Sequence, residues 1–546
     1  MNRSVAYAMA FLLGLQGPAA LAAQDQAATP AVTTKTPIKH LVVIFDENIS
    51  FDHYFGTYPK ALNDGGEPKF VAAPDTPKVN GFTPELLTKN PNLNSANGAG
   101  AANPFRLGRS QASTNDQDND YSPEQMAFDG GKMDLFPLNT GAGGNALGDP
   151  ITNGPAKANT NGLAMAYFDG NTVTALWNYA QNYAMSDNYF ETTFGDSTLG
   201  AVNLISGQTN GIIDLINGNS DEVAGGAGST TLIGEPDPEN DVCSDPTEDL
   251  AYLGGKNIGN LLSAHHVTWG WFSDGFDLSV TNVNGTTGCY RGTSSSVTGV
   301  KDDNDYSPHR EPFQYYPSTA NPKHIRPASL AVIGQDGDKA NHQYDLHDWA
   351  QALQAGNLPA VSFLKPKTIQ SGHSGESDPL DEQDFLVNTI NFIEQSPFWD
   401  STAIVVTYDD SDGWYDHQAS PIVNSSMGVA DFLNGTGVCG DQEKILPGID
   451  SYNEHAMARC GHGPRLPLLI ISPWSKTNFV DHNLTDQTSV IRFVEDNWLG
   501  GERIGQGSFD ELAGSLENMF DFEDAARAQH AGRLILDAHS GLVVSK

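Results

Sequence analysis

Short apolar runs separated by polar stretches dominate the hydrophobic pattern of this chain. Runs rich in β-branched and aromatic residues occur at 41–45, 267–272, 360–364, 403–408 and 466–474. Continuous runs of this length are typical of buried strands in a parallel sheet. Helical periodicity appears at 172–184, 381–395 and 489–498. The pattern predicts an α/β fold whose central sheet is mostly parallel and has helices on both faces.

Polar residues follow two of these predicted strands directly. Glu47 and Asn48 come just after the run 41–45, and Asp409 and Asp410 follow the run 403–408. Ligands of open α/β sheets bind outside the carboxyl ends of the strands. Two adjacent carboxylates repel each other, and a bound cation removes that cost. Asp409 and Asp410 therefore indicate a metal site, and the alternative is a turn with solvated aspartates. For Glu47, the alternative is a solvated loop residue.

Ser197 stands shortly before a predicted helix that starts near residue 201. A hydroxyl at such a position is usually an N-cap. A helix N-terminus also presents free N–H groups and a positive dipole to an anion. A serine at that point can attack a phosphate group, so spacing alone leaves both interpretations open.

The composition limits the possible partners. The chain has 29 basic and 67 acidic residues among 546, which gives a net charge of −38. Nucleic-acid binding is not expected, because a phosphate backbone requires basic patches. The 56 glycines and 31 prolines predict loop-rich insertions, the largest at about 59–162.

The first residues read as an export signal, with Arg3 before an apolar run and small residues near position 22. That run is too short to span a bilayer. We expect a signal peptide at 1–22, a disordered lead-in at 23–39, a catalytic domain with insertions at 40–520 and a tail at 521–546. The protein is then periplasmic or secreted, without stable membrane insertion. Its oligomeric state is open.

The four cysteines have an even count, which favours two disulfides in an exported chain. Of the three possible pairings, we favour the nearest neighbours, Cys243 with Cys289 and Cys439 with Cys460. A zinc site is the lesser alternative, since no Cys-x-x-Cys spacing occurs.

Several motifs together resemble a known family. The segment 47–56 reads Glu-Asn-x-Ser-Phe-Asp-His-Tyr-Phe-Gly, 206–209 reads Ser-Gly-Gln-Thr, and 407–417 reads Thr-Tyr-Asp-Asp-x-Asp-Gly-x-x-Asp-His. These motifs resemble the bacterial phosphoesterase family of phospholipases C and acid phosphatases, which is similar in fold to alkaline phosphatase. The resemblance covers roughly residues 40–500, with the motifs in the expected order.

The resemblance implies a set of site residues. It implies one divalent metal ion of unknown identity, with the ligands Glu47, Asn48, Ser197, Asp409 and Asp410. Ser197 falls on the nucleophile position, with the Thr198 hydroxyl beside it as a substrate contact. His309 and His373 match histidines that bind phosphate and protonate the leaving alcohol. The chain departs from the family at Asn119 and Arg310, where histidines are usual. Arginine still binds phosphate but does no acid–base chemistry.

By the same resemblance, the expected function is that of an exported acid phosphatase, a phosphomonoesterase acting through a phosphoserine. An acidic pH optimum follows if its histidines are unperturbed. A phospholipase C acting on phosphatidylcholine-type diesters is one alternative. The short remainder after the catalytic domain favours the phosphatase. Because Asn119 and Arg310 replace histidines, a non-catalytic exported binding protein on a decayed phosphoesterase fold is another.

Overall fold

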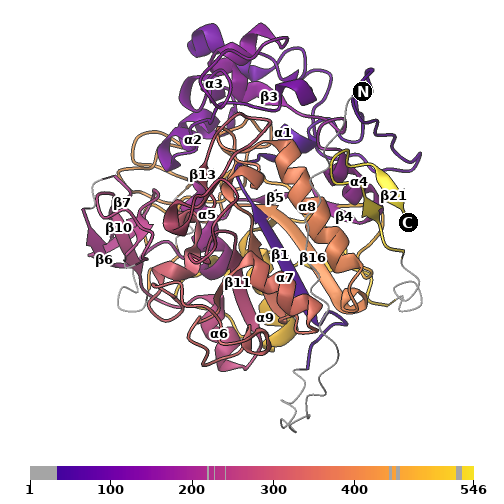
Figure 1. Cartoon of the computed structure of the whole chain (residues 1–546). Helices are drawn as coiled ribbons and strands as arrows, with labels where there is room; N and C mark the ends of the chain where they lie inside the picture. Colours follow the sequence, from indigo (N-terminus) through magenta and orange to yellow (C-terminus); the bar gives the residue numbers. More distant parts are fainter. Residues whose placement is uncertain are drawn as a thin grey trace. The chain divides into compact units, whose positions relative to one another are not determined.

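The fold is built around an eight-stranded central sheet, which includes β1 (His40–Asp46) and β16 (Thr402–Tyr408) in Figure 1. The structure is a computed structural model that describes residues 33–217, 220–226, 228–239, 241–441, 446–449, 456–523 and 532–546. The expected signal peptide and most of the expected lead-in lie outside these residues. In spatial order, the strands of the sheet are β14 (Gln343–Asp345), β11 (Trp269–Ser273), β15 (Val361–Lys365), β1 (His40–Asp46), β16 (Thr402–Tyr408), β17 (Leu468–Ile471), β4 (Ala184–Ser186) and β18 (Phe479–Asp481).

The five strands from β14 to β16 run parallel to one another. β17 is antiparallel to both of its neighbours, and β18 is parallel to β4. β1 lies between β15 and β16, and its residues Leu41 to Phe45 are buried because both faces of the strand are covered. The expected α/β fold with a mostly parallel sheet is therefore confirmed.

Helices cover both faces of the sheet. Val42 and Ile44 of β1 belong to a hydrophobic cluster that includes residues of α4, α7 and α8. Figure 1 shows α7 and α8 beside β1 and β16. On the other face, α6 packs against β11, and α5 packs against α9. The helices are α1 (Phe51–Phe55), α2 (Tyr121–Phe128), α3 (Phe136–Asn139), α4 (Thr174–Asn182), α5 (Ser197–Ser206), α6 (Ile258–Ala264), α7 (Leu346–Gln354), α8 (Pro379–Glu394) and α9 (Thr488–Trp498).

Loop-rich insertions interrupt this core, as expected. The first lies between α1 and α4 and contains α2, α3 and several short 3₁₀ turns. The second lies between α5 and α6 and carries a small sheet and a hairpin. The strands outside the main sheet are β2 (Phe105–Arg106), β3 (Ala166–Tyr167), β5 (Tyr189–Phe190), β6 (Ile212–Ile216), β7 (Glu222–Gly226), β8 (Ser229–Leu232), β9 (Asp237–Pro238), β10 (Leu250–Leu253), β12 (Gly292–Thr293), β13 (Asp303–Asn304), β19 (Thr485–Asp486), β20 (Ile535–Leu536) and β21 (Val543–Ser545).

Both disulfides are present in the pairing that the sequence favours, Cys243–Cys289 and Cys439–Cys460. The first joins the second insertion to the loop after β11. In the described part of the chain, no helix combines the length and the apolar character that crossing a membrane requires. The described end of the chain contacts the core, since Asn391 of α8 donates a hydrogen bond to the Leu536 carbonyl.

Candidate active site

Three neighbouring parallel strands end at the same edge of the sheet. Leu364 of β15 pairs with Ile44 of β1, and Asp46 at the end of β1 pairs with Tyr408 of β16. This register brings the residues that follow these strands into one place. Glu47 and Asn48 follow β1, and Asp409 and Asp410 follow β16. All four are buried, so their polar atoms must be paired within the protein.

Ser197 reaches this edge from the first turn of α5. The helix begins at Ser197 itself, and the N-cap is Asp196, whose side chain makes no capping hydrogen bond. Ser197 Oγ instead donates to Asp410 Oδ2 at 3.0 Å, and it lies 3.3 Å from Asn48 Oδ1, a second acceptor. The interpretation of Ser197 as an N-cap is therefore wrong. Its hydroxyl is directed at the strand ends.

Further hydrogen bonds connect the oxygen-bearing residues. Asp409 Oδ1 accepts from the backbone N–H of Asn48 at 3.0 Å and from that of Asp410 at 2.9 Å. Asn48 has a positive φ of 61° and donates its Nδ2 to Asp412 Oδ1 at 2.9 Å. Asparagine tolerates this left-handed conformation better than most residues. Four of the five expected metal ligands thus lie in one connected cluster.

Glu47, the fifth expected ligand, joins the cluster through two cations. Lys365 Nζ lies 2.8 Å from Glu47 Oε1 and 3.3 Å from Asp409 Oδ2. Arg310 Nε lies 2.9 Å from Glu47 Oε2. Burial alone would raise the pKa of Glu47, but Arg310 and Lys365 lower it to about 2. Glu47 is therefore ionised throughout the physiological pH range.

The pKa values of Asp409 and Asp410 are raised, whereas that of Glu47 is lowered. Burial raises the pKa of Asp409 to about 6, even though the Lys365 ammonium acts in the other direction. Burial and the neighbouring Asp409 carboxylate raise the pKa of Asp410 well above its ordinary value. The cluster thus holds more negative charge than its cations offset. Carboxylate, amide and hydroxyl oxygens are ligands that hard divalent cations prefer, so these residues fit the expected metal.

Two cationic side chains, Arg310 and His373, share the carboxylate of Glu376. Arg310 binds Glu376 as well as Glu47, with Nη1 2.9 Å from Glu376 Oε2. The ring of His373 lies 3.9 Å from the same Glu376 oxygen. Burial alone would lower the pKa of His373, but Glu376 and Asp116 raise it to about 9. Arg310 and His373 are therefore two cationic groups that share Glu376, and Arg310 also reaches Glu47 of the cluster.

The remaining expected contacts have different surroundings. Asn119 donates its Nδ2 to Asp410 Oδ1 at 2.9 Å, so it contacts an expected metal ligand directly. The Thr198 hydroxyl donates to the backbone carbonyl of His309 at 3.0 Å. The nitrogens of the His309 ring lie 3.8 Å from Glu235 and 3.8 Å from Asp237. His309 and His373 thus have different carboxylate partners.

His309, the residue before Arg310, lines a cavity of about 620 Å³. Its wall also contains the first disulfide and the exposed ring of Tyr290. The carboxylates of the wall are Asp221, Glu235, Asp237, Asp245, Glu248 and Asp249. The cavity is therefore strongly acidic.

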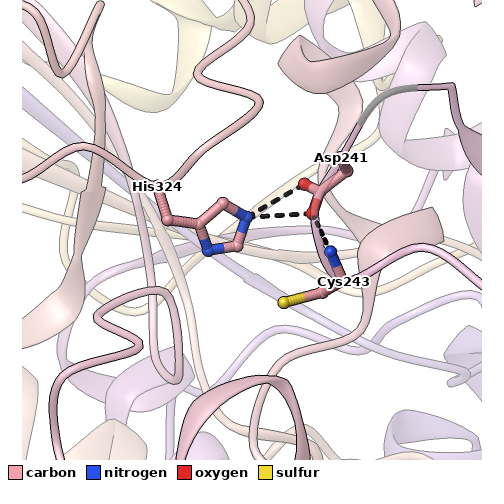
Figure 2. Close-up of side chains that lie close together, drawn as sticks. All are labelled: Asp241, Cys243 and His324. Atoms are coloured by element: carbon pink, nitrogen blue, oxygen red, sulfur yellow. Dashed lines mark hydrogen bonds and ion pairs between the residues drawn. The ribbon is translucent and has the colours of Figure 1, made fainter.

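Figure 2 shows a buried pair, His324 and Asp241, beside Cys243, which belongs to the cavity wall. His324 Nε2 lies 3.0 Å from Asp241 Oδ1, which also accepts the backbone N–H of Cys243 at 2.8 Å. Tyr306 and Gln314 donate to the other Asp241 oxygen. The Cys243 sulfur is bonded to Cys289, so this trio does not supply a thiolate to a metal. It fixes the disulfide loop.

Sequence reasoning missed three residues of the site. Lys365 ends β15 and binds two expected ligands, Glu376 pairs with Arg310, and Asp412 accepts from Asn48. The available signal for Lys365 was a charged residue at the end of a strand predicted to be buried. Glu376 lies in a polar loop and has no comparable signal.

Comparisons with known proteins agree with the motifs. A model described as the Phosphoesterase family matches residues 38–499. A non-hemolytic phospholipase C of Pseudomonas aeruginosa is 23% identical over 468 residues, which cover 84% of this chain and 54% of that protein. Phospholipase C A of Mycobacterium tuberculosis is 24% identical over 500 residues, which cover 89% of this chain and 77% of that protein. The chain thus spans about half the length of the Pseudomonas relative.

Solved structures give only a distant likeness. Murine ectonucleotide pyrophosphatase/phosphodiesterase 5 has a TM-score of 0.30 and 11% identity, covering 64% of this chain and 95% of that one. A protein in the alkaline phosphatase superfamily from Vibrio parahaemolyticus has a TM-score of 0.26 and 11% identity, covering 61% of this chain and 62% of that one.

Proposed function

Because the chain belongs to the Phosphoesterase family, we propose that it is a metal-dependent hydrolase of phosphoric esters that acts through a phosphoserine at Ser197. The observation that carries this proposal is the direction of the Ser197 hydroxyl. It donates to Asp410 and lies close to Asn48 Oδ1 rather than capping its own helix. A nucleophilic hydroxyl needs such partners, since a serine is a weak nucleophile at its ordinary pKa.

The oxygen cluster is the proposed metal site. Glu47, Asn48, Ser197, Asp409 and Asp410 would hold one divalent ion. When bound, the ion would lower the pKa of the Ser197 hydroxyl and screen the charge of the incoming phosphate. Burial is the largest cause of the raised pKa values of Asp409 and Asp410, and the Asp409 carboxylate raises that of Asp410 further. A bound cation would relieve this cost, which supports the assignment.

The protein side chains have defined tasks in the proposed reaction. Ser197 Oγ gives its proton to Asp410 Oδ2, its hydrogen-bond acceptor, and attacks phosphorus, and the bond between phosphorus and the alcohol oxygen breaks. Arg310 and His373 bind the phosphate oxygens, and His373 carries a proton that it can donate to the leaving alcohol. Water then hydrolyses the phosphoserine. Phosphoryl transfer depends chiefly on positioning and charge stabilisation, which these groups supply.

Phosphomonoesters are the first candidate substrates. A terminal phosphate carries up to two negative charges, and Arg310 and His373 offer two cationic groups, of which Arg310 contacts the expected ligand Glu47. This supports the phosphatase expected from the sequence. An acidic optimum no longer follows from His373, since this residue stays protonated up to about pH 9.

Phosphocholine-type diesters are the second candidates, and the acidic cavity at His309 favours them. Its carboxylates and the exposed Tyr290 ring suit a cationic alcohol group. The relatives named phospholipase C support the same class. The double variant Glu235→Gln, Asp237→Asn separates the candidates. For a phosphocholine enzyme, we expect KM for p-nitrophenylphosphorylcholine to rise about tenfold, with KM for p-nitrophenyl phosphate unchanged or lower.

The matched control for this experiment is Glu85→Gln, which removes an exposed carboxylate that does not line the cavity. A phosphomonoesterase would hydrolyse p-nitrophenyl phosphate much faster than the diester in every variant. Equal effects of the double variant on both substrates would contradict a choline-binding role of the cavity.

An exported location fits this proposal. Two disulfides are typical of proteins that fold in an oxidising compartment. We therefore place the enzyme in the periplasm or outside the cell.

A further inference from the structure

Lys365 is a lysine in the interior of the protein. Only 2% of its surface is exposed. It is the last residue of β15 and lies next to the end of β1, the central strand of the site. Lysines are almost never fully buried unless their charge is paired, because desolvating an ammonium group is costly. Its partners therefore explain why it is there.

The ammonium group joins two expected metal ligands from different strands. Lys365 Nζ lies 2.8 Å from Glu47 Oε1 and 3.3 Å from Asp409 Oδ2. Glu47 follows β1 and Asp409 follows β16, so the side chain reaches from β15 past the end of β1. The Phe45 ring, 4.8 Å from Nζ, covers the ammonium. One fixed positive charge therefore lies between two carboxylates.

We propose that Lys365 is a positioning residue that serves as a permanent second cation of the site. Its ammonium holds the Glu47 and Asp409 carboxylates in place and offsets one unit of their negative charge. The Glu47 and Asp409 carboxylates are then in place before a metal binds. This inference rests on the metal site of the proposed function.

Two consequences follow from replacing Lys365 with a neutral side chain. The metal-free protein loses one of the two cationic partners of Glu47 and a cationic partner of Asp409, and it becomes less stable. A divalent ion no longer has to bind beside a positive charge, so it binds more tightly. A residue that only fills space in the core would produce the first effect without the second.

The test compares the full-length wild type with Lys365→Met and Lys367→Met. Methionine keeps the length of the side chain without its charge. Lys367 lies two residues further on, and its charge acts on Asp274. Each protein is stripped with EDTA and titrated with Mn²⁺ by calorimetry, and its thermal unfolding is followed with and without Mn²⁺. Neither readout depends on catalysis, so a failure of the proposed hydrolysis leaves this test intact.

For Lys365→Met we expect the Kd for Mn²⁺ to fall at least about tenfold. Its Tm should fall without Mn²⁺ and recover most of the loss with it. Lys367→Met should match the wild type. An unchanged or higher Kd, an equal loss of Tm with and without Mn²⁺, or no Mn²⁺ binding by the wild type would overturn the proposal.

A second variant covers the case in which Lys365→Met does not fold without metal. Lys365→Arg retains the charge, so its Kd for Mn²⁺ should stay within about threefold of the wild type. Expression of Lys365→Met with Mn²⁺ in the medium should yield folded protein, because the metal replaces the missing charge. Failure to fold even then would contradict the proposed role.

Discussion

At the residue scale, the site depends on Ser197, whose side chain does not make the hydrogen bond expected of a serine at a helix start. A serine at the start of a helix normally caps it. Ser197 instead directs its hydroxyl at Asp410, with Asn48 Oδ1 close by, while Asp196 takes the capping position without a side-chain bond. An unsatisfied cap costs the helix about 1 kcal/mol. Such local inconsistency is typical of functional residues.

His373 gives the prediction that depends most directly on one residue. Glu376 and Asp116 raise its pKa to about 9, so the imidazolium is present below that pH and is lost as pH rises through it. We expect kcat/KM for p-nitrophenyl phosphate to fall about tenfold per pH unit above about pH 9. His373→Asn should lower kcat/KM about 10²- to 10⁴-fold and remove this alkaline limb.

The control for this pH profile is His266→Asn, which changes an exposed histidine. It should leave both the rate and the limb unchanged. An alkaline limb that persists in His373→Asn would show that another group titrates there.

At the element scale, the position of α5 against the end of β16 brings Ser197 to the carboxylates. Gly200 makes this approach possible. A Cβ atom at Gly200 would lie 2.0 Å from the Asp409 carbonyl oxygen, a distance that no real contact allows. Any side chain at this position must therefore push the helix away from the strand end.

Gly200→Ala tests this arrangement. We expect the variant to fold, since alanine has a higher helix propensity than glycine, but to lose at least about 10²-fold in kcat because Ser197 moves. Circular dichroism and p-nitrophenyl phosphate turnover measure the two effects. Gly65→Ala is the control, because a Cβ there meets nothing within 4 Å. Wild-type kcat in Gly200→Ala would show that the helix position is not critical.

The elements themselves could be read from the sequence to different extents. β1 and β16 were predicted within a residue or two, because their apolar runs are long and continuous. β14, β4 and β18 were missed, since a strand of three residues leaves no readable pattern. The run 466–474 forms only β17, and its antiparallel direction follows from pairing rather than from its own residues.

The site was predictable where motifs mark it. Glu47, Asn48, Asp409 and Asp410 follow readable strands, and the structure brings them together with Ser197. Ion pairs between distant segments are not visible in the sequence, so Glu376 was missed, and the partners of Lys365 could not be named even though its place at a strand end was readable. The acidic cavity at His309 was also missed, although five of its six carboxylates lie within residues 235–249, because an acidic stretch of sequence does not by itself show that a cavity forms.

At the scale of the whole molecule, a buried network joins segments that are far apart in sequence. Arg465 binds Asp52 and Asp416, each at 3.1 Å, and His417 binds Asp52 at 2.6 Å. Asp52 lies in α1, just after the loop that carries Glu47, and Asp416 follows the loop of Asp410. The network therefore fixes the two ligand-bearing loops relative to each other.

Asp52→Asn should destabilise the whole protein, by about 3–5 kcal/mol, because it breaks a fully buried ion pair. His417 and Arg465 hold the pKa of Asp52 below its ordinary 3.8, so this stabilisation is lost as pH falls through the lowered value. Burial would lower the pKa of His417, but Asp52 raises it above 6.5. The contribution of His417 to stability is therefore lost as pH rises through this raised pKa. The difference in Tm should thus be largest between about pH 4 and 6.5.

Scanning calorimetry below, within and above this pH range checks the prediction, with the exposed Asp64→Asn as control. A Tm difference that does not vary with pH would contradict the electrostatic account of the network.

The most direct measurement of the central claim is to trap the covalent intermediate. Enzyme turning over p-nitrophenyl phosphate with Mn²⁺ is quenched in acid, digested and mapped by mass spectrometry. We predict phosphate on Ser197 in the wild type, and none in Ser197→Ala, whose kcat should fall at least about 10³-fold. Phosphate on another residue, or hydrolysis that persists in Ser197→Ala, would contradict the proposed mechanism.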